Sequence, residues 1–197
     1  MIRRDYIIVA GNIGTGKTSV IEALRSRVEG FLVLFEKRDI FLERYYSDPM
    51  KYAFLNQLAF SLQYLEQAVQ VAKSSAPVVQ DRSIYDTHHV FSRIQYDSGA
   101  ISEEQFSLLQ RVFNAADSLV WPTLLVMLHA PVDLVYDRMV QRGVKEEAKV
   151  PKSYLLTLGD AYDRWYSEFD RCEKMLISTQ QKSPQEAAEQ IASALNH

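Results

Sequence analysis

Short apolar runs alternate along this chain with longer stretches in which apolar residues recur every three or four positions. Unbroken apolar runs of about four to eight residues are typical of strands buried on both faces, whereas the three-to-four spacing is typical of helices that bury one face. The apolar runs are Tyr6–Ala10, Phe31–Phe35, Pro77–Gln80, Thr123–His129 and Lys174–Ile177. This alternation predicts an α/β fold in which a five-stranded parallel sheet is flanked by helices on both faces.

The longest helical stretch lies between the second and third apolar runs. Its pattern predicts a pair of helices over about residues 40–73, and Asp48-Pro49 supplies an N-cap and a first-turn proline for the second helix. Five apolar residues of that second helix are predicted to form its buried face: Phe54, Leu58, Leu62, Leu65 and Val69.

Composition narrows the class of protein. The 197 residues suit a single domain, 1–197, with a small lid, and a net charge of −3 without any Lys/Arg run argues against a nucleic-acid partner. No stretch approaches the roughly 20 apolar residues of a membrane span. Met1-Ile2-Arg3-Arg4 leads directly into the first strand, so we expect no targeting segment and a cytoplasmic protein. The single cysteine, Cys172, excludes an internal disulfide and is predicted to be a reduced structural thiol in a helical stretch.

The segment between the first strand and the first helix carries the clearest chemical signal. It matches the pattern G-x-x-x-x-G-K-[ST], whose backbone N–H groups and helix N-terminus favour an anionic phosphate. Lys17 is predicted to reach the β- and γ-phosphates, and the Thr18 hydroxyl to ligate Mg²⁺. The predicted nucleotide-binding residues are Gly11, Asn12, Ile13, Gly14, Thr15, Gly16, Lys17, Thr18 and Ser19. An exposed lysine in a glycine-rich turn is the less interesting alternative.

Charged residues follow the ends of the predicted strands, where ligands of open parallel sheets bind. Glu36 ends the second strand and Asp81-Arg82 ends the third, so either carboxylate could accept a proton in phosphoryl transfer. Asp81 could instead pair with Arg82. Arg138 and Arg142 lie four residues apart on one predicted helix and could neutralise phosphate charge, or form an exposed basic face.

Aromatic residues are concentrated on the helices that follow the second and third strands. Most aromatic residues belong to a core, but a nucleobase binds by stacking, and an amide such as that of Gln57 can hydrogen-bond a base edge in two directions. The cluster comprises Tyr45, Tyr46, Phe54, Phe60, Tyr64, Tyr85 and Phe91. The adjacent His88 and His89 lack metal-ligand spacing and are expected to be structural or surface residues.

Taken in order, these motifs resemble the deoxyribonucleoside kinases, the group of P-loop kinases that includes deoxycytidine, deoxyguanosine and deoxyadenosine kinases. The resemblance runs from about Asp5 to Tyr154. It rests on the phosphate loop, the strand-ending Glu36, Tyr46-x-x-Pro49 followed by Gln57, Asp81-Arg82-Ser83-Ile84-Tyr85, and Arg138-x-x-x-Arg142-Gly143 followed by Glu146-Glu147.

The resemblance implies a role for each of these residues. Glu36 would be the base for the sugar 5′-hydroxyl, Arg82 would lie near the 5′-oxygen and the phosphates, and Asp81 near Mg²⁺. Tyr46 and Glu147 would contact the sugar 3′-hydroxyl, Gln57 would pair with the base, and Phe91 would stack on it. Residues 138–150 would form a small helical lid carrying Arg138 and Arg142. ATP or another nucleoside triphosphate and Mg²⁺ would be required, and a homodimer is expected.

Several positions depart from the family pattern. Lys37 replaces the usual proline after the base, Asn56 stands where an aromatic residue commonly precedes the glutamine, and Val144 replaces a third lid arginine, which Lys145 could compensate. Tyr64 and Thr87 occupy the places of an arginine–aspartate pair near the base. A less charged pocket favours broad or pyrimidine-leaning specificity.

The leading hypothesis is therefore an ATP- and Mg²⁺-dependent kinase that phosphorylates the 5′-hydroxyl of a small-molecule deoxyribonucleoside. The first alternative is a nucleoside monophosphate kinase resembling thymidylate kinase, whose phosphorylated acceptor requires extra cations that Lys37 and Arg38 could supply. The second is a catalytically silent nucleotide-binding subunit, which the presence of both Lys17 and Glu36 disfavours.

Overall fold

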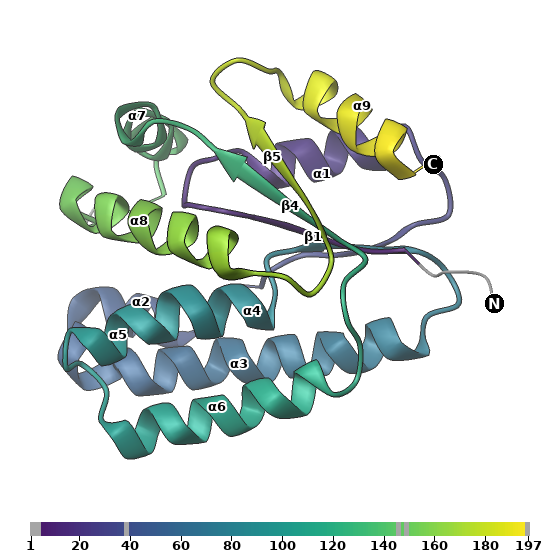
Figure 1. Ribbon diagram of the computed structural model, residues 1–197. Coiled ribbons are helices and arrows are strands. Elements are labelled where there is room, and N and C mark those ends of the chain that lie inside the picture. Colours follow the sequence, from purple (N-terminus) through teal and green to yellow (C-terminus); the bar gives the residue numbers. More distant parts are fainter. Residues whose placement is uncertain (1–4, 38–39, 145–146, 148–149, 196–197) are drawn as a thin grey trace.

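A five-stranded parallel sheet forms the centre of the protein, in the strand order β2-β3-β1-β4-β5 (Figure 1). The computed structural model describes residues 5–37, 40–144, 147 and 150–195. The strands are β1 (Tyr6–Gly11), β2 (Leu32–Leu34), β3 (Val78–Asp81), β4 (Leu124–His129) and β5 (Glu173–Ser178). All five predicted strands are confirmed, with ends that differ by no more than one residue.

Helices connect successive strands and cover both faces of the sheet (Figure 1). They are α1 (Lys17–Arg25), α2 (Ile40–Ser47), α3 (Pro49–Lys73), α4 (Ile84–Asp86), α5 (Arg93–Asp97), α6 (Glu103–Asp117), α7 (Val132–Arg142), α8 (Lys152–Glu168) and α9 (Pro184–Leu195), and a π-helix, η1 (Thr87–Ser92), joins α4 to α5. The predicted α/β class is confirmed, as is the helix pair between β2 and β3.

Two apolar layers follow from the alternation of side chains along the strands. On one face, Ile7 and Val9 of β1 pack with Leu24 of α1 and Ile191 of α9. On the other face, Ile8 packs with residues of α3, α6 and α8. In Figure 1, α1 and α9 accordingly lie above the sheet, and α3, α6 and α8 below it. Both faces of β1 are buried, which is why the strand appears in the sequence as a continuous apolar run.

Glycines allow the turn from β1 into α1. Gly11, Gly14 and Gly16 all have positive φ angles, and a Cβ added at Gly11 would lie 2.5 Å from the carbonyl oxygen of Leu128. Gly16 occupies the N-cap position of α1 in the left-handed conformation. With no capping side chain at Gly16, the first N–H groups of the helix remain available to an anion.

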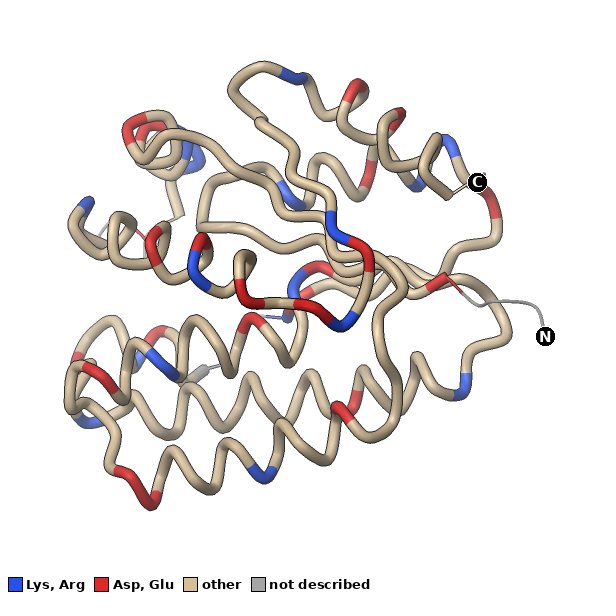
Figure 2. Tube along the Cα trace, viewed as in Figure 1, with Lys and Arg blue, Asp and Glu red and all other residues tan. Residues whose placement is uncertain are grey.

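The buried face of α3 differs from the predicted one. Leu62 is 45% exposed, whereas Asn56, Gln57 and Gln67 are buried. The inner face of this helix therefore mixes apolar residues such as Phe60 with amides, and Gln57 and Gln67 are buried because they have hydrogen-bond partners there. Figure 2 shows that α3 is almost free of charge between its ends, where only Glu66 interrupts the run from Tyr52 to Ala72.

Cys172 also lies outside a helix. The helix α8 ends at Glu168, and Cys172 is in the bend that leads into β5, with an intermediate exposure. Burial raises the pKa of its thiol to about 11, so it is protonated at neutral pH. The prediction of a helical setting was wrong because Phe169, at the C-cap of α8, is extended.

Candidate active site

The phosphate loop encloses the ammonium group of its own lysine. Lys17 Nζ donates hydrogen bonds of 3.0 Å to the carbonyl oxygens of Gly11 and Asn12. The Asn12 amide donates to the carbonyl of Leu155 at 2.8 Å, which ties the loop to α8. Burial, together with the nearby charge of Arg82, lowers the pKa of Lys17 to about 8. A phosphate beside this group would favour its charged form.

Thr18 and Asp81 meet at the base of the loop. Thr18 Oγ1 donates to Asp81 Oδ2 at 3.1 Å, and the other carboxylate oxygen, Oδ1, is buried without a hydrogen-bond partner among the residues that the structure describes. A buried oxygen without a partner is costly unless a cation or water binds it. Hydroxyl and carboxylate oxygens are the ligands that Mg²⁺ prefers, so the pair fits the expected metal site.

Glu36 and Arg82 form an ion pair between the phosphate loop and α3. Arg82 Nη1 donates to both carboxylate oxygens of Glu36, at 3.1 and 2.9 Å, and Tyr64 Oη donates to Oε2 at 2.9 Å. Burial alone would raise the pKa of Glu36, but the charge and hydrogen bonds of Arg82, with smaller effects of Lys17 and Tyr64, hold it below its ordinary value. Glu36 is therefore ionised at neutral pH and can accept a proton.

The backbone of Arg82 is strained. Its φ of 57° is the only positive φ of a non-glycine residue in the described part of the chain. Its guanidinium lies 4.8 Å from the centre of the Phe91 ring, a cation–π distance. Such strain persists where surrounding contacts determine it, and it is often found at functional sites.

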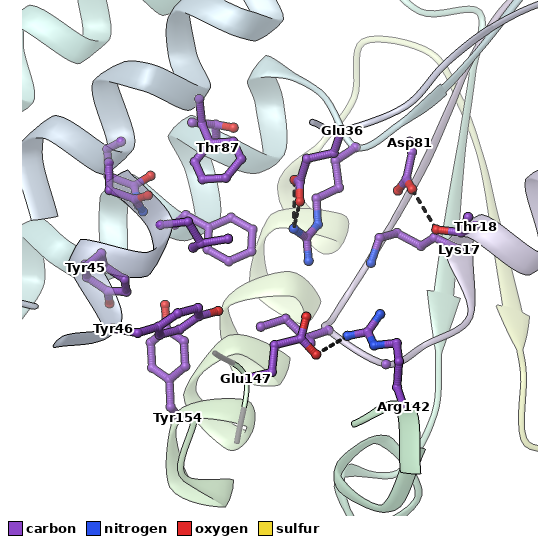
Figure 3. Close-up of a pocket in the computed structure, with 18 residues that line it drawn as sticks. Lys17, Thr18, Glu36, Tyr45, Tyr46, Asp81, Thr87, Arg142, Glu147 and Tyr154 are labelled. Carbon is purple, nitrogen blue, oxygen red and sulfur yellow. Dashed lines mark hydrogen bonds and ion pairs between the residues drawn. The ribbon is translucent and has the colours of Figure 1, made fainter. Parts of the chain in front are cut away.

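A cavity of about 190 Å³ opens beside Glu36. We call it the acceptor cavity. In Figure 3, one side of it is lined by Tyr45, Tyr46 and Tyr154, and the opposite side by Lys17, Thr18 and Asp81. Glu36 lies between the two sides. Every residue predicted to bind substrate lines it: Glu36, Tyr46, Gln57, Arg82, Thr87, Phe91 and Glu147. The first and last of these residues, Glu36 and Glu147, are 111 positions apart in the sequence, but the fold brings them to one cavity.

A second cavity, of about 490 Å³, lies on the other side of the phosphate loop. It is lined by loop residues and by Arg138, Thr179, Lys182 and Pro184. Four residues line both cavities: Gly14, Lys17, Thr18 and Arg142. Two cavities that share a wall of predicted phosphate-binding residues are suited to a donor and an acceptor that react across that wall.

The two predicted lid arginines have different surroundings. Arg138 donates to the Thr179 hydroxyl at 3.0 Å and to the Thr179 carbonyl at 2.8 Å, so it faces the second cavity and not the acceptor cavity. Arg142, at the end of α7, pairs with Glu147 between the two cavities (Figure 3). Of the predicted lid, residues 145–146 and 148–149 lie outside the described residues.

Sequence reasoning did not assign several residues that line the acceptor cavity. These are Leu42, Tyr45, Asn56, Phe60 and Tyr154. Tyr45 and Phe60 were part of the aromatic cluster, and Asn56 was visible as a departure from the family pattern. Tyr154 gave no signal, because its place in the cavity depends on how α8 packs.

Two other expectations concern residues near the site. The side chain of Lys37 is exposed and lines an outer groove with Leu58 and Leu62 in place of the acceptor cavity, whereas Arg38 and Lys145 lie outside the described residues. His88 is buried and stacks on Phe106 and Phe113, as expected of a structural residue. Burial lowers its pKa to about 4.

Comparison with known proteins agrees with this geometry. A family model described as deoxynucleoside kinase matches residues 7–197. The deoxyadenosine/deoxycytidine kinase of Bacillus subtilis is 26% identical over 98% of this chain and 94% of its own length. The deoxyguanosine kinase of Lactobacillus acidophilus is 32% identical over 87% of this chain and 79% of its own length.

Solved structures show the same fold. The deoxyadenosine kinase of M. mycoides with bound dATP superposes with a TM-score of 0.83 at 19% identity and covers 98% of this chain and 100% of its own. No helix in the described ranges is both long enough and apolar enough to cross a membrane.

Proposed function

This chain belongs to the deoxynucleoside kinase family, and from that premise we propose the role of each residue in phosphorylating the 5′-hydroxyl of a deoxynucleoside. Glu36 accepts the proton of the 5′-hydroxyl. The 5′-oxygen then forms a bond to the γ-phosphorus of a nucleoside triphosphate, the bond to the bridging oxygen breaks, and the diphosphate leaves. Arg82 orients Glu36 and the attacking oxygen.

The observation that carries this proposal is the position of Glu36. It is ionised, it is held by two donors, and it lines an acceptor cavity that shares the wall of Lys17, Thr18 and Arg142 with the second cavity. A general base must lie within hydrogen-bond reach of the proton that it removes. We expect a nucleoside in the acceptor cavity, facing a triphosphate in the second cavity, to bring its 5′-hydroxyl within this reach of Glu36.

Positive charge on the shared wall would stabilise the transition state. Lys17 and Arg142 would neutralise charge that develops on the transferred group. Thr18 and Asp81 would hold Mg²⁺, which supplies further positive charge to the phosphates when bound. Arg138 bonds to Thr179, which lines the second cavity. We therefore propose that Arg138 holds the segment around Thr179 in place beside the phosphate donor, and that it does not have the catalytic role suggested by the sequence.

The remaining cavity residues would recognise the nucleoside. Tyr46 and Glu147 would contact the 3′-hydroxyl, and Gln57 would hydrogen-bond the base edge. Ser92 donates to Gln57 Oε1 at 3.3 Å, which supports a fixed orientation of that amide. Phe91 would contact the face of the base, and Thr87 would line the base pocket.

An unphosphorylated acceptor is favoured over a nucleoside monophosphate. Among the described residues, the cations that line the acceptor cavity are Lys17, Arg82 and Arg142. Lys17 is bound by loop carbonyls, Arg82 by Glu36, and Arg142 by Glu147. A second phosphate group would need its own cation, and the exposed Lys37 side chain lies in the outer groove.

Acceptor trials with each deoxynucleoside and its 5′-monophosphate, in the presence of ATP and Mg²⁺, test this proposal. We expect the deoxynucleosides to be phosphorylated, and turnover of the monophosphates alone would refute the assignment. Glu36→Gln should abolish turnover while ATP binding persists. The control is Glu66→Gln, an exposed carboxylate on α3 outside the acceptor cavity, which should leave turnover unchanged.

We also propose a homodimer that works in the cytoplasm, where ATP and deoxynucleosides are both present. Exposed leucines on the neighbouring helices α3 and α6, among them Leu62 and Leu108, support a contact between helices of two copies. Sedimentation analysis would measure the state of association, and a monomer at micromolar concentration would contradict the dimer.

A further inference from the structure

The segment that carries Glu36 is not held by the sheet. The strand β2 contains only three residues and lies at the edge of the sheet, where it pairs with β3 alone. Glu36 stands two residues beyond its end. The ladder therefore stops before Phe35, and the backbone polar groups around the proposed base need other partners.

Two amide side chains of α3 supply those partners. Gln63 Oε1 accepts from the backbone N–H of Lys37 at 2.9 Å, and Gln63 Nε2 donates to the carbonyl of Lys37 at 2.8 Å. One helical turn later, Gln67 Nε2 donates to the carbonyl of Phe35 at 2.9 Å. The residues on both sides of Glu36 are thus bound to one face of one helix.

The second of these amides is itself anchored in the sheet. Gln80 of β3 donates to Gln67 Oε1 at 2.6 Å, and the Tyr6 hydroxyl of β1 donates to Gln80 Oε1. Gln67, Gln80 and Tyr6 are all buried. A fully satisfied buried network of this kind is rigid, so it connects the backbone beside Glu36 to the central strand that leads into the phosphate loop.

We propose that Gln63 and Gln67 are positioning residues that fix the catalytic base through its backbone, an inference that rests on the proposed role of Glu36. One of the two hydrogen bonds of Gln63 requires an N–H at position 37, which proline lacks. Lys37 in place of the proline of the resembling kinases is therefore part of this arrangement. Its backbone, and not its ammonium group, is what the site uses.

Amides suit this position because they carry no charge. The buried residues of α3 are all uncharged, and the one charged residue between Tyr52 and Ala72, Glu66, is exposed. A carboxylate or an ammonium group at 63 or 67 would act on Glu36 directly and change its pairing with Arg82. Glutamine fixes the backbone and leaves the ion pair undisturbed.

Gln63→Leu removes both hydrogen bonds to Lys37 and keeps a similar side-chain volume. We expect kcat to fall about tenfold, because small displacements of a reacting group are costly, while the KM values for nucleoside and ATP stay within about twofold. The acid limb of the kcat/KM profile should move to higher pH as Glu36 loses its fixed contact with Arg82. Gln67→Leu should act in the same direction. The control is Gln70→Leu, an exposed residue of α3 without a side-chain hydrogen bond in the described structure, which should leave kcat unchanged.

Lys37→Pro provides a second, independent test. It removes the N–H that Gln63 binds, whereas Lys37→Ala keeps it and should retain wild-type kcat. If Gln63 acts through this N–H, Lys37→Pro lowers kcat in the wild-type background and adds little in the Gln63→Leu background. Effects that multiply independently would overturn the proposal.

Melting temperatures of all variants separate positioning from folding. A lower melting temperature with unchanged kcat for Gln63→Leu would show a merely structural role and overturn the proposal. If Glu36→Gln abolishes turnover and Gln63→Leu does not reduce it, positioning fails and the proposed function stands. If Glu36→Gln retains turnover, the proposed function itself fails.

Discussion

Removing the Tyr64 hydroxyl tests how the charge of Glu36 is stabilised. Tyr64 is 1% exposed, and its hydroxyl donates to Glu36 Oε2 at 2.9 Å, with the Asp81 carbonyl a weaker second acceptor at 3.4 Å. Tyr64→Phe removes this donor and little else. The side chain of Glu36 is 22% exposed and keeps both hydrogen bonds to Arg82.

The expected loss of stability is modest. A hydrogen bond to a charged group contributes about 1.5–3 kcal/mol, and partial exposure of Glu36 places this one at the lower end, about 1.5 kcal/mol near neutral pH. Because the pKa of Glu36 is lowered in the folded state, its ionised form contributes stability above its ordinary pKa, and that contribution is lost as pH falls through the folded-state value. The difference between variant and wild type should therefore shrink in acid.

Urea denaturation near pH 8 measures the stability loss, and the pH profile of kcat/KM reports the pKa of the Glu36 carboxylate. Without the donor, the pKa of Glu36 should rise toward its ordinary value, so the acid limb of the profile moves to higher pH. Tyr166→Phe, a change on α8 away from the acceptor cavity, serves as the control. An acid limb that stays in place in Tyr64→Phe, despite a loss of stability, would refute the reasoning.

Three further predictions concern other parts of the site. Arg142→Ala should lower kcat about 100-fold while the nucleoside KM changes little, because the arginine lies between the two cavities; steady-state kinetics with each substrate varied measures this split. Burial raises the pKa of Asp86 to about 6, so the folded state holds this proton more tightly than the unfolded chain and the wild type loses stability as pH rises toward 6. The stability of Asp86→Asn relative to wild type, measured by denaturation near pH 5 and pH 7.5, should therefore improve with pH, and a constant difference would contradict the assignment. Gly11→Ala should lower the free energy of unfolding by about 2 kcal/mol or more, because its Cβ would lie 2.5 Å from the Leu128 carbonyl oxygen. A melting temperature equal to that of the wild type would contradict this prediction and show that β1 and β4 can move apart at this position at little cost.

The sheet and the phosphate loop were predictable because their signals are local. A strand buried on both faces is apolar throughout, as β1 is. The loop requires glycines and a lysine at fixed spacing, since its backbone must turn tightly and point inward. The positions of Glu36 and Asp81 followed from these elements, because the carboxyl ends of parallel strands meet at one edge of the sheet.

The inner face of α3 was not predictable from amphipathicity. A pattern of apolar residues favoured Leu58 and Leu62, but the helix turns amides toward the site and leaves Leu62 45% exposed. Burying a glutamine side chain destabilises the fold unless its amide finds hydrogen-bond partners there. Those partners, the Phe35 carbonyl and Gln80, belong to other segments of the chain, so a helical wheel of α3 does not include them.

Long-range contacts explain the residues that sequence reasoning missed. Tyr154 reaches the acceptor cavity only because α8 packs over the phosphate loop, where Asn12 donates to the carbonyl of Leu155, 143 residues away. Tyr64 was assigned to a place near the base, yet its hydroxyl is on Glu36. Neither contact leaves a trace in local spacing.

The departures of this chain from the family pattern become intelligible when they are considered together. Lys37 stands where the resemblance implies a proline, and it supplies a backbone N–H that Gln63 binds. Tyr64, the next residue on the same helix, stands where the resemblance implies a charged side chain, and it donates to Glu36. Both changes transfer the support of the base to neutral donors and acceptors on α3, so the ion pair with Arg82 remains the dominant electrostatic contact of Glu36. If this reasoning is correct, positions 37, 63 and 64 form one functional unit, and a proline at 37 lowers kcat in the wild type but adds little once Gln63 has been changed.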